Sequence, residues 1–295
     1  MKKIIIFLLF VFLPFTAFSQ PQMSEKHGSI YVESAEYAEV EQLFSDYDYK
    51  DFGHRDLKIP RIYLKSLPRD WENIEKSDDK NRTFIKILLP LIMKINEELD
   101  LERLSILSLL EKINKGQSLN DKERKFVEKK AEEYDVFTRN KEDVRYKIML
   151  SELAEKVDEL PPSFLIAVAG VYSDWGNSRL AIKANSLFRE ELWYSDEGIA
   201  PEGVENADFT YRKFDSLEDS LRSYIHKVNS NITYRFVWAA RSQMREIGTK
   251  VVGQQIITAM AYEGKLKNIV GMLDFNLSYY KLNKTDINPT LENVR

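Results

Sequence analysis

The sequence contains no cysteine among its 295 residues. This absence excludes disulfide bonds, cysteine-ligated metals, thiol nucleophiles and a lipid-modified N-terminal cysteine. Histidine is scarce as well, since only His27, His54 and His226 are present, and none lies in a ligand spacing such as His-Glu-x-x-His. We therefore predict no metal, no cofactor and no Ser-His-Asp triad. The three histidines are expected to be surface or packing residues.

An excess of charge of one sign is also missing. Lysine and arginine number 43 and aspartate and glutamate 47, which gives a net charge of −4. A nucleic-acid-binding domain is usually basic on one face, so the sequence predicts no nucleic-acid partner. No apolar run after residue 18 approaches the roughly 20 residues that a membrane span needs, so we expect no span in the mature chain.

The first residues have the order of a secretory signal peptide. Two lysines at positions 2 and 3 precede an apolar run over 4–18, and small residues stand at Ala17 and Ser19. A charged start, an apolar stretch and small residues before the cleavage point define such signals. We predict cleavage after Ser19, which removes residues 1–19, and export to the periplasm. An uncleaved anchor is the alternative, and the short apolar run disfavours it.

Two segments show little hydrophobic periodicity. Residues 20–56 are polar and rich in aromatics, and we predict a flexible leader there. Residues 283–295 are polar, and we predict a disordered tail. Between them we expect an N-terminal helical region over 57–159 and a second domain over 160–282.

Apolar residues at spacings of three and four predict a long helix over 81–115, and Pro90 should kink it. Asn120 followed by Glu123 resembles a capping box and starts a helix that ends near Asp135. These helices, with one more over 142–159, show no cluster of catalytic residue types, so we interpret them as a structural scaffold. Further helices are expected over 217–228, 234–247 and 254–272.

A helix that begins at Pro162 is the most informative segment. Proline suits the first turn of a helix, and the residues that follow are apolar nearly all round, which predicts a helix buried inside the domain and ended by Gly176. Tyr172 falls in helical register with Val168 and Trp175. This register predicts that Tyr172 is an aromatic of the core or of a cleft wall.

This helix and the residues after it carry a set of motifs, which comprises Ser173, Trp175-Gly176, Ser178-Arg179, Ala181, Asn185-Ser186-Leu187-Phe188 and Tyr211-Arg212-Lys213-Phe214-Asp215-Ser216. In these motifs the chain resembles the Bax-like bacterial proteins, which carry the glucosaminidase domain of glycoside hydrolase family seventy-three. The resemblance covers roughly residues 57–277. It implies a mainly α, lysozyme-like fold with a small β-hairpin lobe beside a sugar cleft. It also implies cleavage of peptidoglycan strands next to N-acetylglucosamine.

The chain departs from the family at the catalytic position. The family's general acid, a glutamate, aligns with Tyr172. Such an acid needs a carboxyl group with a raised pKa, whereas the pKa of a tyrosine is about 10. Asp174 and Arg189 replace family glycines. Asp174 lies about 200° further around the helix than Tyr172 and tolerates the left-handed conformation, so we expect it to end the helix.

Other carboxylates could serve instead, and the sequence does not choose among them. The candidates are Asp174, together with Glu202 and Glu205 in the expected hairpin loop; Glu190 and Glu191 follow Phe188 closely. The glycan-binding candidates are mostly aromatic, and Tyr262 comes from a shortened partial match to a family tyrosine element. They are Tyr172, Trp175, Asn185, Phe188, Trp193, Tyr211 and Tyr262.

Three functions remain open. The first is an exported, peptidoglycan-associated protein that binds glycan and has lost or impaired hydrolysis. The second is an active endo-β-N-acetylglucosaminidase with a relocated carboxylate, for which two carboxylates about 5–9.5 Å apart in an open cleft would be expected. The third is a structural or partner-binding envelope protein, for which a closed, apolar cleft would be expected.

Overall fold

The computed structural model describes residues 21–49, 57–139, 142–262, 264–287 and 289–294. Helices dominate these residues and the strands are short, so the predicted mainly α class is confirmed. The predicted signal peptide lies outside the described residues. Within the part of the chain that the structure describes, no helix is both long and apolar enough to cross a bilayer.

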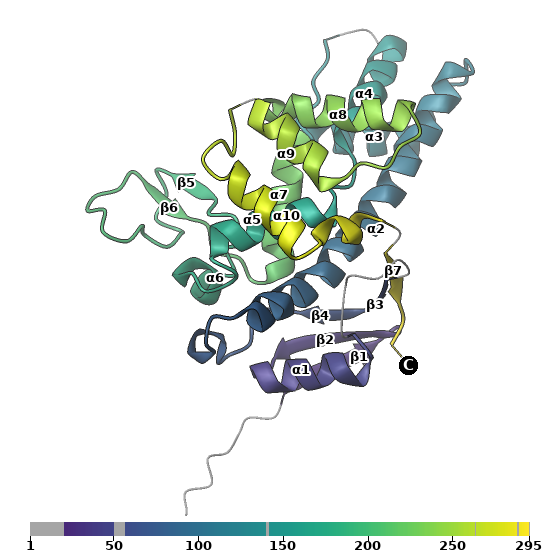
Figure 1. Cartoon of the computed structure of the whole chain (residues 1–295). Coiled ribbons are helices and arrows are strands. Elements are labelled where there is room, and N and C mark those ends of the chain that lie inside the picture. Colours follow the sequence, from purple (N-terminus) through teal and green to yellow (C-terminus); the bar gives the residue numbers. More distant parts are fainter. Residues whose placement is uncertain (1–20, 50–56, 140–141, 263, 288, 295) are drawn as a thin grey trace, which may run out of the picture.

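Helix α2 (Asp78–Asn114) is the long axis on which the other elements pack (Figure 1). The side chain of Ser77 accepts a hydrogen bond from the backbone N–H of Lys80 at 3.2 Å and thereby caps the helix start. The helix continues through Pro90, and nearly every side chain from Thr83 to Asn96 is buried. Its second half extends away from this core and carries α3 (Asp121–Glu133) and α4 (Glu142–Lys156) around a second, smaller hydrophobic cluster.

The predicted flexible leader is wrong for the described residues 21–49. Strands β1 (Gln22–Lys26) and β2 (Ser29–Ser34) form an antiparallel pair, and the other edge of β2 pairs in parallel with β4 (Ile62–Leu64). Helix α1 (Tyr37–Asp46) follows, and Phe44 and Tyr49 are almost fully buried. Burial of these aromatic side chains stabilises the segment through tertiary contacts, which local periodicity does not reveal.

The predicted disordered tail is also wrong. A short 3₁₀ helix, η3 (Leu282–Asp286), is followed by β7 (Thr290–Glu292), which pairs in parallel with β3 (Lys58–Pro60). Asp286 is 1% exposed, and its carboxylate accepts hydrogen bonds from the backbone and hydroxyl of Ser163, at 2.9 and 2.6 Å, and from the N–H of Gly253 at 2.9 Å. The polar tail therefore satisfies donors at the starts of α5 and α9.

Helix α5 (Pro162–Ser173) is buried in the main hydrophobic core. Helix α6 leads to an antiparallel pair, β5 with β6, which projects from the body (Figure 1). Helices α2, α9 and α10 pack against α5, and α8 packs against α9 and α4. The helices and strands after α5 are α6 (Arg179–Ala184), β5 (Glu191–Trp193), β6 (Phe209–Tyr211), α7 (Leu217–Ser230), α8 (Arg235–Glu246), α9 (Gly253–Tyr262) and α10 (Val270–Tyr279). Two short 3₁₀ helices are η1 (Trp71–Asn73), before α2, and η2 (Ile232–Tyr234), before α8.

The predicted helix over 254–272 is in fact two helices. Helix α9 ends at Tyr262, and α10 begins at Val270. Gly264 has φ +81°, in the left-handed region that glycine enters without strain, so the chain turns there. The other predicted boundaries agree with the structure within a few residues, and Asn120 and Glu123 form the predicted capping box.

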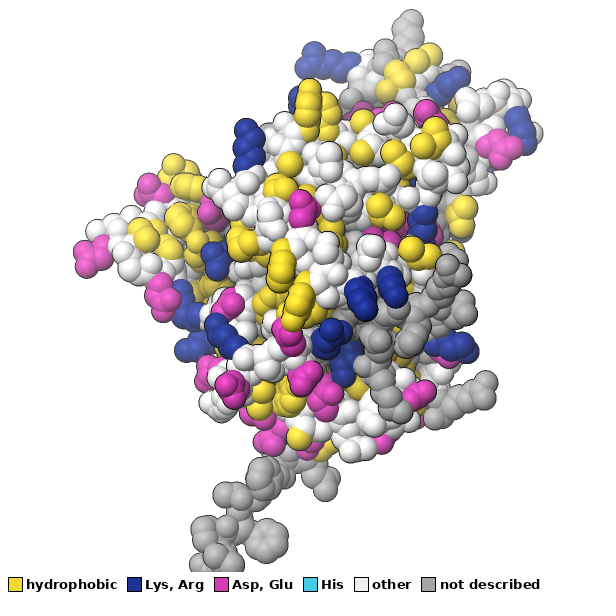
Figure 2. All heavy atoms as spheres, viewed as in Figure 1, with side chains coloured by type: hydrophobic (Ala, Val, Ile, Leu, Met, Phe, Trp, Pro, Cys, Tyr) yellow, Lys and Arg dark blue, Asp and Glu magenta, His cyan; other side chains and the backbone are white. Residues whose placement is uncertain are grey.

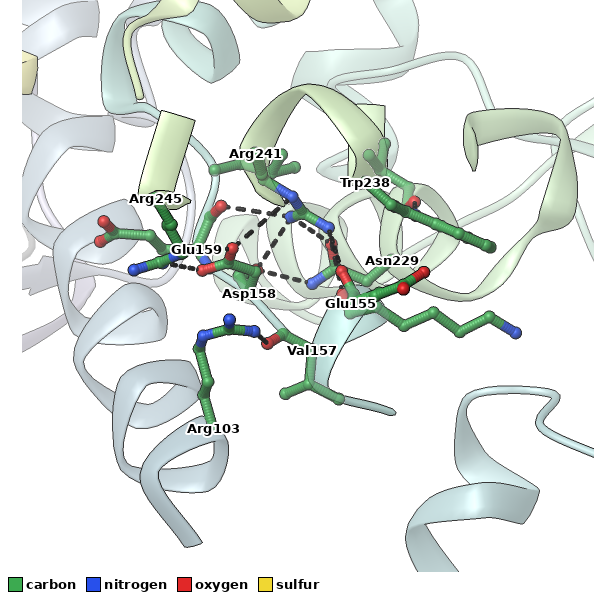
Figure 3. Close-up of polar contacts among 12 residues, drawn as sticks. Arg103, Glu155, Val157, Asp158, Glu159, Asn229, Trp238, Arg241 and Arg245 are labelled. Atoms are coloured by element: carbon green, nitrogen blue, oxygen red, sulfur yellow. Dashed lines mark hydrogen bonds and ion pairs between the residues drawn. The ribbon is translucent and has the colours of Figure 1, made fainter. Parts of the chain in front are cut away.

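A buried polar network links α2 and the end of α4 to α7 and α8 (Figure 3). The fully buried Arg241 donates hydrogen bonds to the side chain of Asn229 at 2.8 Å and to the carbonyl of Lys156 at 3.1 Å. Asp158, 2% exposed, pairs with Arg245, and Arg103 of α2 donates to the carbonyl of Val157 at 3.0 Å. Burial lowers the pKa of Arg241 to about 10, so the guanidinium stays charged at neutral pH.

Candidate functional site

A pocket of about 660 Å³ opens between the end of α5, the β5–β6 pair, α7 and the turn after α9. This volume lies within the roughly 300–1,000 Å³ of typical ligand pockets. Figure 2 shows hydrophobic side chains gathered over the β5–β6 hairpin, beside a body that carries charges of both signs. The lining consists of Tyr172, Phe188, Arg189, Glu191, Trp193, Tyr211, Tyr224, Lys227, Tyr234, Met260, Lys265 and Leu266.

The pocket contains four of the residues proposed from sequence for glycan binding, which are Tyr172, Phe188, Trp193 and Tyr211. Phe188 stacks on Tyr224 with ring centroids 4.1 Å apart and an angle of 6° between the planes, so these two lining rings support each other. Trp193 remains 57% exposed. Its ring therefore presents free aromatic surface to solvent at the edge of the pocket.

The other three candidates do not line the pocket. Trp175 packs between Phe84 and Tyr280, with ring centroids at 5.9 and 4.8 Å. Asn185 has φ +50° at the end of α6, and its amide donates to the carbonyl of Phe214 at 3.2 Å.

Tyr262 is 79% exposed, and its ring contacts Phe236 rather than the pocket.

The predicted helical register between Tyr172 and Trp175 is wrong, because α5 ends at Ser173 and Trp175 has φ +52°.

The three carboxylates proposed from sequence lie outside the pocket too. Asp174 occupies the left-handed C-cap of α5 and pairs with Lys76 at 2.5 Å, so it ends the helix as expected. Glu202 pairs with Arg179 at 3.5 Å and is 83% exposed, and Glu205 is exposed. Of the carboxylates in the described residues, Glu191 alone belongs to the pocket lining.

Tyr172 itself is half-buried in the pocket wall. Its carbonyl accepts a hydrogen bond from the guanidinium Nε of Arg189 at 2.8 Å. Burial raises the pKa of the Tyr172 phenol, and the nearby Arg189 charge offsets this only in part. The phenol therefore holds its proton firmly at neutral pH, and proton donation by it is weak.

Glu190, next to the pocket, is a carboxyl group whose environment sequence reasoning did not identify. It is 8% exposed, one oxygen accepts from the Ser223 hydroxyl at 3.0 Å, and the other has no hydrogen-bond partner. Burial raises the pKa of this carboxyl. The sequence offers no signal that separates Glu190 from the exposed Glu191, because the two are adjacent and chemically alike.

The raised pKa of Glu190 predicts a pH-dependent effect of the Glu190→Gln substitution on stability. The folded chain binds this proton more tightly than the unfolded chain, so wild-type stability falls as pH rises from 4.5 through the folded pKa. Glutamine removes that fall. Denaturant unfolding at several pH values should therefore show the variant gaining stability relative to wild type as pH rises, with Glu191→Gln as the exposed control. A difference that does not change with pH would contradict this assignment.

A second pocket, of about 400 Å³, lies between α2, the start of α5 and the C-terminal segment. It is lined by acidic side chains that include Asp100, Glu159 and Asp286, and no aromatic ring lines it. The Asp286 oxygens are already engaged with Ser163 and Gly253. This pocket lacks the aromatic surface that a sugar ring needs, so we place the functional site in the pocket beside Tyr172.

A family model described as a mannosyl-glycoprotein endo-beta-N-acetylglucosaminidase, the glucosaminidase family, matches residues 148–275. This range contains α5, the hairpin and every residue of the aromatic pocket. Protein bax from Escherichia coli (strain K12) is 29% identical over 203 residues, which are 68% of this chain and 67% of that protein. Residues 148–275 of this chain therefore form a glucosaminidase domain, and the chain is similar to protein bax.

The match to the family model starts within α4 and ends within α10. A solved structure, the catalytic domain of the autolysin Auto from Listeria monocytogenes, is similar at 19% identity. The matched region covers 57% of this chain and 89% of the autolysin domain, with a TM-score of 0.31. Because the family model spans residues 148–275, the aromatic pocket lies inside an N-acetylglucosaminidase-like domain, with Tyr172 in the pocket wall.

Proposed function

We propose that this protein binds peptidoglycan glycan strands in the aromatic pocket and that its hydrolytic activity is lost or impaired. The observation that carries the proposal is Tyr172, which stands in the pocket wall at the position where the resemblance places the general acid. The charged start and apolar run of residues 1–19 support export to the periplasm, where the glycan is found.

The chemistry of the pocket favours binding over cleavage. Retaining and inverting glycosidases both use a pair of carboxyl groups on either side of the scissile bond. In the described part of the pocket lining, Glu191 is the one carboxylate, and it is exposed. Aromatic rings such as Trp193 and Tyr211 remain available to stack on sugar rings, and the open volume leaves room for them.

An active hydrolase with a relocated carboxylate is the alternative that one observation favours. Glu190 is a buried carboxyl group with a raised pKa, which is the state that a general acid requires. It lies next to the pocket residues Arg189 and Glu191 but does not itself line the pocket. We therefore place this alternative second.

The test uses purified peptidoglycan and measures two quantities, release of soluble muropeptides and co-sedimentation of the protein. Wild type should sediment and release nothing. Trp193→Ala and Tyr211→Ala should each weaken sedimentation about 5- to 30-fold, as expected for loss of an aromatic contact worth about 1–2 kcal/mol. Tyr262→Ala is the control, because Tyr262 is an exposed aromatic outside the pocket.

Muropeptide release by wild type would overturn the proposal. If that release disappeared in Glu190→Gln, the relocated carboxylate would be identified. Absence of both release and sedimentation would point instead to the scaffold or partner-binding function.

A further inference from the structure

The aromatic pocket carries an excess of positive charge. Arg189, Lys227 and Lys265 line it, against the single carboxylate of Glu191. The chain is otherwise slightly acidic, with a net charge of −4. Among the residues that the structure describes, none of these three cations takes part in an ion pair, whereas lysines and arginines elsewhere do, as Lys94 does with Glu218 and Lys130 with Glu102.

The three cations reach the pocket from different elements. Arg189 precedes β5, Lys227 lies on α7, and Lys265 follows α9. The Lys265 ammonium sits 4.4 Å from the centre of the Tyr234 ring, which holds it over the pocket wall by a cation–π contact. A pocket with low-dielectric walls and one sign of charge concentrates ligands of the opposite sign.

Arg189 is held at this site against a conformational cost. Its φ is +51°, in the left-handed region, where a residue with a side chain costs roughly 1–2 kcal/mol. Its Nε–H bond to the carbonyl of Tyr172 fixes the guanidinium beside that residue. Two of the positions at which the chain departs from the family pattern, 172 and 189, are therefore in direct contact. Backbone strain of this kind often marks a functional position.

The sign of the charge matters for the two possible activities. Glycoside cleavage passes through a transition state that resembles an oxocarbenium cation, and fixed cations destabilise it. A carboxylate on a bound ligand gains from the same cations through charge-assisted hydrogen bonds, most of all with the planar guanidinium of Arg189.

We propose that the pocket selects glycan strands that carry carboxylates, and that Arg189 is the residue that determines this specificity. This inference rests on the proposed function, because it assumes that glycan occupies the pocket. The ligand class is an anionic oligosaccharide that bears lactyl or peptide carboxylates, in contrast to a neutral N-acetylglucosamine oligomer. Lys227 and Lys265 supply general attraction, and Arg189 supplies the directed contact.

The experiment compares soluble peptidoglycan fragments with the same fragments after their carboxylates have been converted to amides. We expect wild type to bind the native fragments about 3- to 10-fold more tightly than the amidated ones, and to lose this preference at high salt. Arg189→Gln should remove most of the preference, and the general attraction of Lys227 and Lys265 should leave only a small remainder that high salt removes. Lys183→Gln, which removes an exposed cation outside the pocket, is the charge-matched control.

Arg189→Gly guards against a folding artefact, since glycine relieves the strained φ and should melt no lower than wild type. Equal binding of native and amidated fragments by wild type would overturn this inference and leave glycan binding intact. Retention of the preference in Arg189→Gln would exclude Arg189 as its source. Failure of wild type to bind either fragment would overturn the proposed function together with the inference.

Discussion

The Tyr172→Glu variant should release muropeptides from purified peptidoglycan, whereas wild type should release none. A carboxyl group at this position would stand in the wall of the aromatic pocket, half-buried, where desolvation raises its pKa. A positioned general acid typically contributes about 10²–10⁴ in rate. The measurement is chromatography of the soluble products at several times of digestion.

Arg189 should limit this gain. Its guanidinium already contacts the backbone of Tyr172, and a cation within a few ångströms lowers the pKa of a carboxyl group. We therefore expect Tyr172→Glu combined with Arg189→Gly to be faster than Tyr172→Glu alone at neutral pH. Its pH optimum should also be higher.

The control for both variants is Tyr172→Gln, which has the shape of glutamate but no proton to donate. Activity in that variant would show that the general acid is another group, with Glu190 the first to test. Inactivity of the Tyr172→Glu, Arg189→Gly double variant, in a protein that still folds and sediments with peptidoglycan, would show that the pocket has lost more than its acid.

The second large effect is expected at the buried network around Asp158. Replacement of Asp158 by alanine leaves the buried guanidinium of Arg241 without its nearest carboxylate, and breaking a buried pair typically costs about 3–5 kcal/mol. Denaturant unfolding should show this as a lower midpoint. Glu202→Ala is the matched control, because it removes one partner of an exposed pair, which should contribute about 0–1 kcal/mol.

A milder substitution keeps the prediction testable if Asp158→Ala does not fold. Asp158→Asn keeps the size of the side chain and one acceptor oxygen, and should lose less stability than alanine. If Asp158→Ala and Glu202→Ala lowered the free energy of unfolding by the same amount, the buried network drawn in Figure 3 would contribute no more to stability than an exposed ion pair.

The sequence predicted those elements whose signal is local. The helix that starts at Pro162 and the capping box of Asn120 need only neighbouring residues to form, and both are present. The leader and the tail were predicted wrongly because their order comes from distant contacts. Phe44 is buried against the core of α2, and Asp286 binds the backbone of residues far earlier in the chain. Periodicity does not report such contacts.

The sequence predicted some residues of the pocket and missed others, again because only the tertiary fold brings distant segments together. Tyr172, Phe188, Trp193 and Tyr211 converge on one pocket, as the resemblance implied. Trp175 was misplaced because the helical register was extended past the point at which α5 ends. The positive charge of the pocket was not predicted, since Lys227 lies on α7 and Lys265 in the turn after α9, and only the tertiary fold brings them together.

The parallel pairing of β3 with β7 has a consequence for the order in which the protein assembles. Ile59 pairs with Leu291, so this two-stranded sheet forms only after both strands, about 230 residues apart in the sequence, have been synthesised. Contacts between such distant segments form slowly, because a very long loop must first be closed. The pair of β3 and β7 therefore closes late, and a truncation that removes Thr290–Glu292 would leave Ile59 without its strand partner.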